Sequence, residues 1–284
     1  MTASAPSCRS PRAARHRYMA MLSTALLLAA SLAAHAQSAP GASKPLPDAP
    51  QPQPQSQSQS QDAITVRNTP RNILHDQLAI WTSPARLRPH DLLWLAPFAV
   101  AAGVSIATDH HTMSQVVSHD PSFNNANVNA SNAMIGGFIA APVALFGYGH
   151  FEKSEHAREA GILSGEALVD AVGVEEGMKL IFWRERPALD NARGKFFQSG
   201  AGIDSSFPSS HSVLAWATAS AIATEYPSFW TQALVYTGAT GISLTRVLGQ
   251  QHFPTDVLVG ATAGWLVGRY VVHHHHRHHA LATH

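Results

Sequence analysis

The chain of 284 residues contains a single cysteine, Cys8, which precedes a long apolar run near the N-terminus. One cysteine forms no internal disulfide, so the folded part must be stabilised by its core. Because Cys8 lies before the apolar run, it is not the lipidated cysteine that follows a lipoprotein signal. Charge is also scarce, with 13% charged residues and a formal net charge of +1. This balance argues against a nucleic-acid-binding protein, which would show a basic face.

Residues 1–36 are expected to form a secretory signal peptide. Several arginines precede the apolar run 19–33, and Ala34-His35-Ala36 is a small-x-small cleavage site. The alternative is an uncleaved anchor helix, for which the run is short. Cleavage predicts export, to the periplasm or the outer face of the inner membrane of a bacterium.

The remaining chain divides into three parts by composition. Residues 37–70 are rich in Pro, Gln and Ser and are expected to form a disordered tether, because they have little apolar surface to bury. Residues 71–272 form the expected helical domain, and residues 273–284 a flexible His-rich tail. We assign no metal site to this tail, because nothing around it would fix the geometry of its histidines.

The apolar pattern from residue 72 onward is helical, without sustained alternation of period two. It predicts an all-α fold, a single bundle of about six core helices after an amphipathic lead-in helix at 72–81. The Asn-rich segment 124–132 is expected to be a polar loop, with the entrance to a site as the alternative. The predicted core helices are 92–107, 133–149, 161–183, 212–224, 231–244 and 256–272.

The sequence leaves the relation of these helices to a membrane open. At about 17 residues, several are at the lower limit for a membrane span. The third carries charged residues that are costly in lipid unless they face a protein interior. If the signal is cleaved, three crossings would deliver Lys179 to the cytoplasm, whereas an even number or none keeps it outside. We therefore favour a membrane-associated periplasmic domain over a six-span protein. The charged residues of the third helix are Glu166, Asp170, Glu175, Glu176 and Lys179.

Three short stretches carry candidate chemistry, and the first runs from Lys179 to Pro187. Lys179 is expected near the end of the third helix, and Arg186 two turns later on the same face, with Pro187 ending the helix. Lys and Arg suit a phosphate-like oxyanion, because both offer charge-assisted hydrogen bonds to its oxygens. Taken alone, the pair is also explained as surface charge that complements the helix dipole.

The second stretch is Phe207-Pro-Ser-Ser-His211, and the third is Thr245–Asp256, which contains Arg246 and His252. Serines before an apolar run predict a helix N-cap, and first-turn N–H groups bind anions. In the third stretch, His252 is expected just before the sixth helix and Asp256 in its first turn. A carboxylate there can accept one imidazole N–H and leave the other nitrogen as a nucleophile. Taken singly, helix capping explains both stretches.

In this order, the stretches resemble the signature of the type 2 phosphatidic acid phosphatase family, which includes bacterial non-specific acid phosphatases and vanadium haloperoxidases. That signature reads Lys-x6-Arg-Pro, Pro-Ser-Gly-His and Ser-Arg-x5-His-x3-Asp, and the resemblance covers residues 179–256. Two positions depart from it. Thr245 replaces Ser and keeps the hydroxyl. Ser210 replaces Gly and adds a Cβ where a backbone N–H should approach phosphate, which narrows the pocket or alters its turn.

The resemblance implies a phosphatase that acts on phosphomonoesters or lipid (pyro)phosphates through a phosphohistidine. It makes His252 the nucleophile, Asp256 its orienting carboxylate and His211 the acid that protonates the leaving alcohol. It requires no metal and no cofactor. The residues it implies for holding the phosphate are Lys179, Arg186, Ser209, Ser210 and Arg246.

Two alternatives remain open at this point. One is a haloperoxidase, which would hold vanadate as its cofactor in the same cage. The other is a non-catalytic envelope protein that binds anions or a partner, for which Ser210 is the support. The partner expected from the resemblance is a phosphate ester, with lipid and soluble phosphates both candidates, and the oligomeric state is not assigned.

Overall fold

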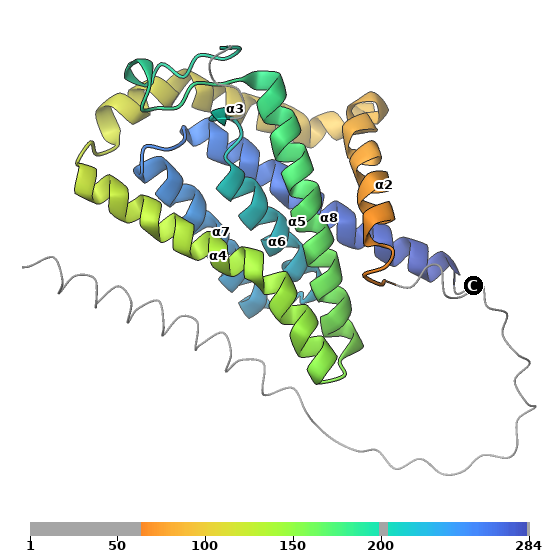
Figure 1. Ribbon diagram of the computed structural model, residues 1–284. Helices are drawn as coiled ribbons and strands as arrows, with labels where there is room; N and C mark the ends of the chain where they lie inside the picture. The colour runs from red at the N-terminus through yellow and green to blue at the C-terminus, as the bar shows by residue number, and fades with distance from the viewer. Residues whose placement is uncertain (1–63, 199–203, 283–284) are drawn as a thin grey trace, which may run out of the picture. The chain divides into compact units, whose positions relative to one another are not determined.

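The computed structural model describes residues 64–198 and 204–282. Within these ranges the chain contains seven α-helices and no β-strand, so the predicted all-α bundle with a lead-in helix is confirmed (Figure 1). The predicted signal peptide and nearly all of the tether lie outside the described residues. The helices are α2 (Thr69–Thr82), α3 (Leu92–His111), α4 (Pro121–Phe151), α5 (Glu155–Phe182), α6 (Ser210–Glu225), α7 (Phe229–Leu248) and α8 (Pro254–Ala282).

Helix α4 begins well before its predicted start, so the prediction of a loop over 124–132 is wrong. Asp120 is the N-cap residue, and its side chain accepts a hydrogen bond from the N–H of Phe123 at 2.8 Å. Pro121 occupies the first helical position, where a missing N–H does no harm. Because the helix starts at these two residues, it includes the Asn-rich segment. This segment therefore lies against the ends of α6 and α7.

Helix α6 is the centre of the bundle, and α8 crosses it closely. Its buried face is built largely from alanine and serine side chains. On α8, a Cβ at Gly264 or Gly268 would overlap the backbone of α6. Small residues on both helices therefore let the two backbones approach, which sets the start of α8 beside the start of α6.

Helix α2 contacts the bundle through polar side chains. Asp76 is fully buried and lies 3.0 Å from His275 Nε2, and Gln77 donates to the Asp170 carboxylate at 2.8 Å. Helix α2 also carries large apolar side chains that are partly exposed. These are Leu74 and Leu78, each 67% exposed, and Trp81, 42% exposed.

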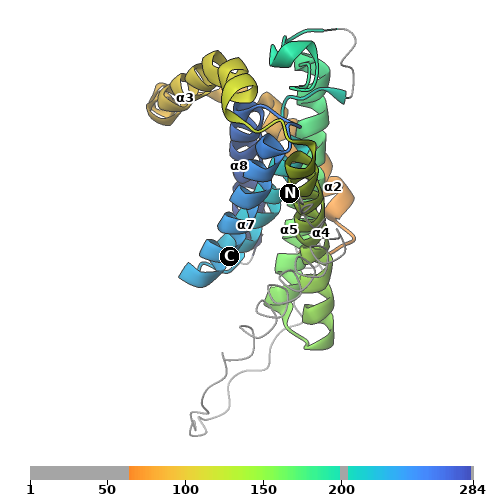
Figure 2. The same ribbon diagram turned by 90° about the vertical axis from the view of Figure 1, so that its left-hand side faces the viewer.

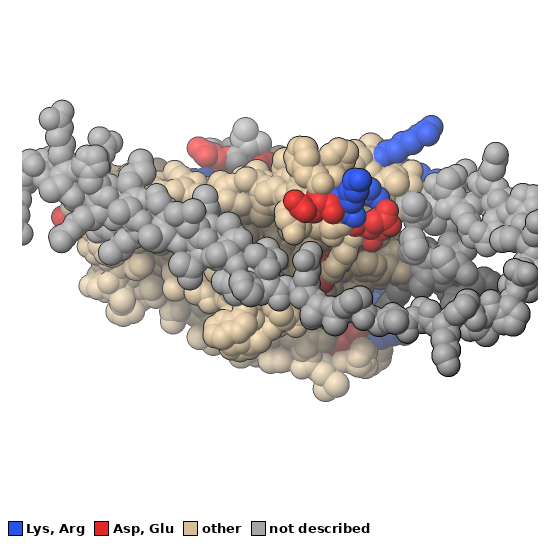
Figure 3. Space-filling model, turned by 90° about the horizontal axis from the view of Figure 1, so that it is seen from below, with Lys and Arg blue, Asp and Glu red and all other residues tan. Residues whose placement is uncertain are grey.

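Charged side chains are also buried in α5. Of the five charged residues named above for the third core helix, Glu166, Asp170, Glu175 and Lys179 are buried, so four of the five meet the condition under which such charges are tolerated near lipid. On the face seen in Figure 3, charged side chains gather in a few places and most of the remaining visible surface is uncharged.

Two segments of the described chain are long and apolar enough to cross a membrane, Pro89–Val116 and Pro121–Phe151. Their most apolar windows are 0% and 17% buried inside the protein, so they are not ordinary core helices of a soluble bundle. Helix α3, in the first segment, runs along the outside of the bundle beside α8 (Figure 2).

Helix α8 continues ten residues beyond its predicted end at 272. The first histidines of the His-rich segment therefore belong to the bundle, with His275 against Asp76 and His276 Nε2 at 2.6 Å from Glu225. Among the described residues, no group of three or more His, Cys, Asp or Glu side chains could hold a metal ion.

Candidate active site

The first stretch is divided between a helix and a loop. Helix α5 ends at Phe182, where Trp183 takes up left-handed backbone angles (φ 39°, ψ 57°). The prediction that Lys179 and Arg186 share one helix face, with Pro187 ending the helix, is therefore wrong. Arg186 lies in the following loop and donates to the carbonyls of Asp204 and Gln251, both at 3.2 Å. The loop thus brings Arg186 to the second and third stretches.

The second stretch starts α6 at Ser210, with Ser209 in the N-cap position. The prediction of a serine N-cap is correct in position, but Ser209 makes no side-chain capping hydrogen bond within the described chain. Ser210 Oγ instead donates to Glu175 Oε1 at 2.5 Å. Ser209 Oγ is fully buried and has no hydrogen-bond partner among the described residues. The first turn of α6 also has N–H groups that no residue of the helix can satisfy.

The third stretch places His252 just before α8 and Asp256 in its first turn, as predicted. His252 is 1% exposed, and its Nδ1 lies 2.8 Å from the carbonyl oxygen of Ser206 but 3.8 Å from Asp256. A carbonyl only accepts, so this contact assigns the proton to Nδ1 and the lone pair to Nε2. The Ser206 carbonyl, rather than the predicted carboxylate, makes the hydrogen bond that orients the ring.

Asp256 instead binds an arginine that the sequence analysis missed. Its carboxylate accepts from Arg184 Nη1 at 2.6 Å, Ser206 Oγ at 2.5 Å and the Phe253 N–H at 2.8 Å. Arg184 is 2% exposed and also pairs with Asp109, at the end of α3, at 2.7 Å. Its guanidinium lies over the Phe253 ring, 4.1 Å from the centroid, a favourable cation–π geometry. This buried network ties α3, α8 and the loop after α5 together behind His252.

Arg246 lies in the last turn of α7 and is 6% exposed. Its Nη1 donates to Ser131 Oγ on α4 at 3.2 Å, whereas its Nε is buried without a hydrogen-bond partner in the described chain. Thr245 uses its hydroxyl within α7, donating to the carbonyl of Gly241 at 2.9 Å. A buried donor without a partner is costly, so the orphaned Nε of Arg246 indicates a place for a ligand.

His211, in the first turn of α6, contacts Asn132 of α4, with Nε2 at 2.9 Å from Oδ1. Burial is the main cause that lowers the pKa of His211 to about 4, and nearby positive charge adds to it. The titratable side chains that act on it are the predicted ones, which shows that the fold brings them together. They are, in order of effect, Arg246, His252, Arg186 and Lys179.

The pKa of His252 is also lowered, chiefly by burial, against the opposing effect of Asp256. Both histidines are therefore neutral at physiological pH in the ligand-free protein. Burial lowers the pKa of Arg246 to about 10, which leaves it cationic. The site thus combines fixed cations with a histidine nitrogen that carries a free lone pair. We call Lys179, Arg186, Ser209, Ser210 and Arg246 the anion cage.

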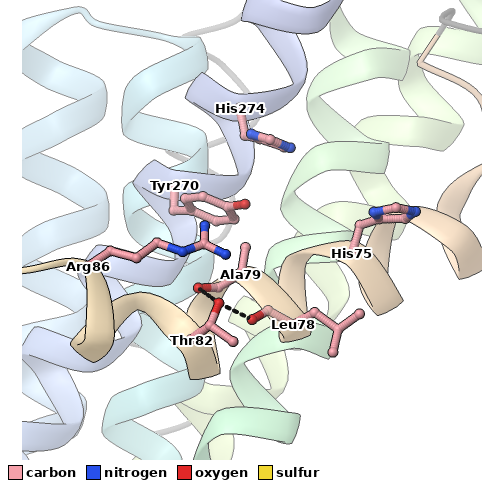
Figure 4. A pocket seen from close by; sticks show the side chains of 7 residues that line it. All are labelled: His75, Leu78, Ala79, Thr82, Arg86, Tyr270 and His274. Carbon is pink, nitrogen blue, oxygen red and sulfur yellow. Dashed lines mark hydrogen bonds between the residues drawn. The ribbon is translucent and has the colours of Figure 1, made fainter.

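Two surface hollows lie elsewhere in the described chain. One, of about 270 Å³, is drawn in Figure 4, where Arg86, Tyr270 and His274 surround it between α2 and α8. The other, of about 590 Å³, lies between α8 and Trp94 of α3. Residues of the anion cage line neither hollow.

The sequence was also compared with known proteins. Residues 160–280 match the family model described as PAP2 superfamily. A segment of 132 residues is 38% identical to a Porphyromonas gingivalis protein named "Lipid A 1-phosphatase", covering 46% of this chain but 27% of the relative. No solved structure matches the chain. Residues 160–280 therefore resemble the PAP2 superfamily, as the three stretches predicted.

Proposed function

We propose that the chain is a metal-independent phosphatase that forms a phosphohistidine at His252. The observation that carries the proposal is that two buried donors, Ser209 Oγ and Arg246 Nε, have no partner among the described residues, in a site whose two histidines have lowered pKa values. One oxyanion between them would satisfy both donors. The cage takes its positive charge from Lys179, Arg186 and Arg246, side chains that do not ordinarily ligate metals.

The proposed reaction has two steps. The lone pair on His252 Nε2 attacks phosphorus, the bond to the leaving oxygen breaks, and His211 protonates that oxygen. Water then attacks the phosphohistidine, His211 takes the water's proton, and the P–N bond breaks to release phosphate. The cationic side chains of the anion cage stabilise the charge on the equatorial oxygens in both steps.

Protonation of His211 fits the same scheme. In the empty site, burial and neighbouring cations lower its pKa. A bound phosphate dianion offsets those cations, so the pKa of His211 rises in the complex and the ring gains the proton that it must donate.

As substrate we propose a lipid phosphate or pyrophosphate. The relative named "Lipid A 1-phosphatase" supports a phosphorylated lipid, and the exposed apolar surfaces of α3 and α4 support association with a membrane. Helix α4 also reaches the site, where Ser131 contacts Arg246 and Asn132 contacts His211. A headgroup at the anion cage would therefore lie next to an apolar helix that suits its acyl chains.

We further propose that the domain acts at the outer face of the inner membrane. The contact between Asp109 and Arg184 places the site at the C-terminal end of α3. If α3 crossed the membrane, the site would lie opposite the residues that precede it, in the cytoplasm for an exported tether. An exported tether and an outer site therefore require that α3 contacts lipid without crossing the membrane.

The proposal is tested by replacing the nucleophile in purified protein. His252→Ala should reduce hydrolysis of p-nitrophenyl phosphate by a factor on the order of 10⁴ or more. The matched control is His90→Ala, a surface histidine with a 79% exposed side chain, which should leave turnover unchanged. Vanadate should inhibit the unsubstituted enzyme. Unchanged turnover in His252→Ala would refute the proposal, and vanadate-dependent bromination of a dye would indicate a haloperoxidase instead.

A further inference from the structure

Ser210, the departure from the family signature, contacts a carboxylate inside the site. Its hydroxyl donates to Glu175 Oε1 at 2.5 Å, and the same oxygen pairs with Lys179 Nζ. Glu175 is 3% exposed and Lys179 6% exposed. One carboxylate oxygen thus joins the first stretch to the second.

A buried carboxylate is unexpected next to an anion cage. Its charge repels a phosphate dianion, and the repulsion is strong where water is excluded. Lys179 and Glu175 are four residues apart on α5 and face each other across one turn. An ammonium has three N–H donors, so Lys179 can hold Glu175 with one and still offer the others to phosphate oxygens.

We propose that Glu175 positions the Lys179 ammonium for phosphoryl transfer and that Ser210 supplies the second hydrogen bond that holds Glu175 in place. Serine is then the residue that suits this chain, because glycine would leave the Glu175 oxygen with one donor fewer. This inference rests on the proposed phosphatase function. Glu175 is a positioning residue, since it acts on the substrate through Lys179.

The inference has a kinetic signature that general destabilisation lacks. Without the carboxylate, the ammonium is less well fixed where charge develops, so kcat falls. The repulsion of the bound anion is also removed, so phosphate binds as tightly as before or more tightly. Loss of a charge-assisted hydrogen bond corresponds to about a tenfold effect or somewhat more.

The experiment measures kcat and the inhibition constant of inorganic phosphate for three variants, Glu175→Gln, Ser210→Ala and the double variant. The control is Glu176→Gln, whose side chain is 47% exposed and 3.8 Å from Lys179 Nζ; both constants should change less than about twofold. Thermal unfolding of each variant reports whether it folds. If Glu175→Gln does not fold, Ser210→Gly and Ser210→Ala still test the contact.

Support requires a kcat about tenfold lower in Glu175→Gln with an inhibition constant that is not raised. Ser210→Ala should change kcat in the same direction by a smaller factor, and the double variant should match Glu175→Gln, because both substitutions break one contact. A Glu175→Gln variant that behaves like Glu176→Gln overturns the inference. So does a raised phosphate constant, or an effect of Ser210→Ala that adds fully to that of Glu175→Gln.

The two proposals fail separately. If the unsubstituted protein hydrolyses phosphate esters and His252→Ala does not, while Glu175→Gln is unaffected, only the positioning role is refuted. If the unsubstituted protein hydrolyses none, the proposed function and this inference are both refuted.

Discussion

Replacing Asp256 by Asn tests the buried network behind His252. The substitution keeps the volume but removes the charge that pairs with Arg184 at 2.6 Å, in a position that is 0% exposed. Arg184 would keep Asp109 as its remaining carboxylate partner. Breaking a buried ion pair from one side costs about 3–5 kcal/mol. For a domain of this size each kcal/mol lowers the Tm by about 2–4 °C, so we expect a decrease of about 6–20 °C.

The assay is thermal unfolding of purified protein followed by tryptophan fluorescence, with Asp204→Asn as the control. Asp204 is an aspartate whose side chain is 90% exposed and 3.5 Å from Arg186, and its replacement should change stability by less than about 0.5 kcal/mol. Equal melting temperatures for the two variants, with only the activity of Asp256→Asn lost, would contradict this reasoning. Asp256 would then act on His252 directly rather than through Arg184.

Three further predictions follow from the same structure. Gly264→Ala should lower the free energy of unfolding by about 1–3 kcal/mol in chemical denaturation, because the added methyl overlaps the backbone of α6. Gly136→Ala is the control: it has open space around it and should raise the free energy of unfolding by up to about 1 kcal/mol. The pKa of His211 is about 4, and we expect a bound anion to raise it. The complex then binds more protons than the free protein, so inhibition by sulfate should strengthen as the pH falls from about 8 to about 5. An inhibition constant of sulfate that does not change with pH would refute this linkage. Two single-cysteine variants without Cys8 test the topology: Asp204→Cys near the site and Glu152→Cys at the turn between α4 and α5. Both should react with a membrane-impermeant maleimide in intact spheroplasts. Labelling at one position alone would show that the domain crosses the membrane.

The sequence predicted the helical bundle well because its helices are long and periodic. The predicted helix boundaries were wrong where short-range sequence signals compete. Asp120 and Pro121 are typical of a helix N-terminus, but the asparagines that follow have a low helix propensity, so the start of α4 was not predicted. Pro187 is a helix breaker, yet α5 ends five residues earlier at Phe182, followed by Trp183 in a left-handed conformation. Nothing in the local pattern marks tryptophan as a left-handed helix end.

The site shows the same division between local and long-range information. The spacing of the three stretches identified residues that the fold brings together, including His211 and His252. Arg184 was missed because its partners lie 72 and 75 residues away. The Ser206 carbonyl was missed because a backbone acceptor has no signature in residue types. Contacts of this kind depend on the folded chain and cannot be derived from spacing.

The central claim is that His252 accepts the phosphoryl group. The most direct measurement is to react the purified enzyme with ³²P-labelled substrate, quench in alkali, digest, and identify the labelled peptide by mass spectrometry. We predict an alkali-stable, acid-labile phosphoryl group on His252 that is absent from the His252→Ala variant. A label on Ser209 or Ser210, or turnover without any labelled peptide, would contradict the account.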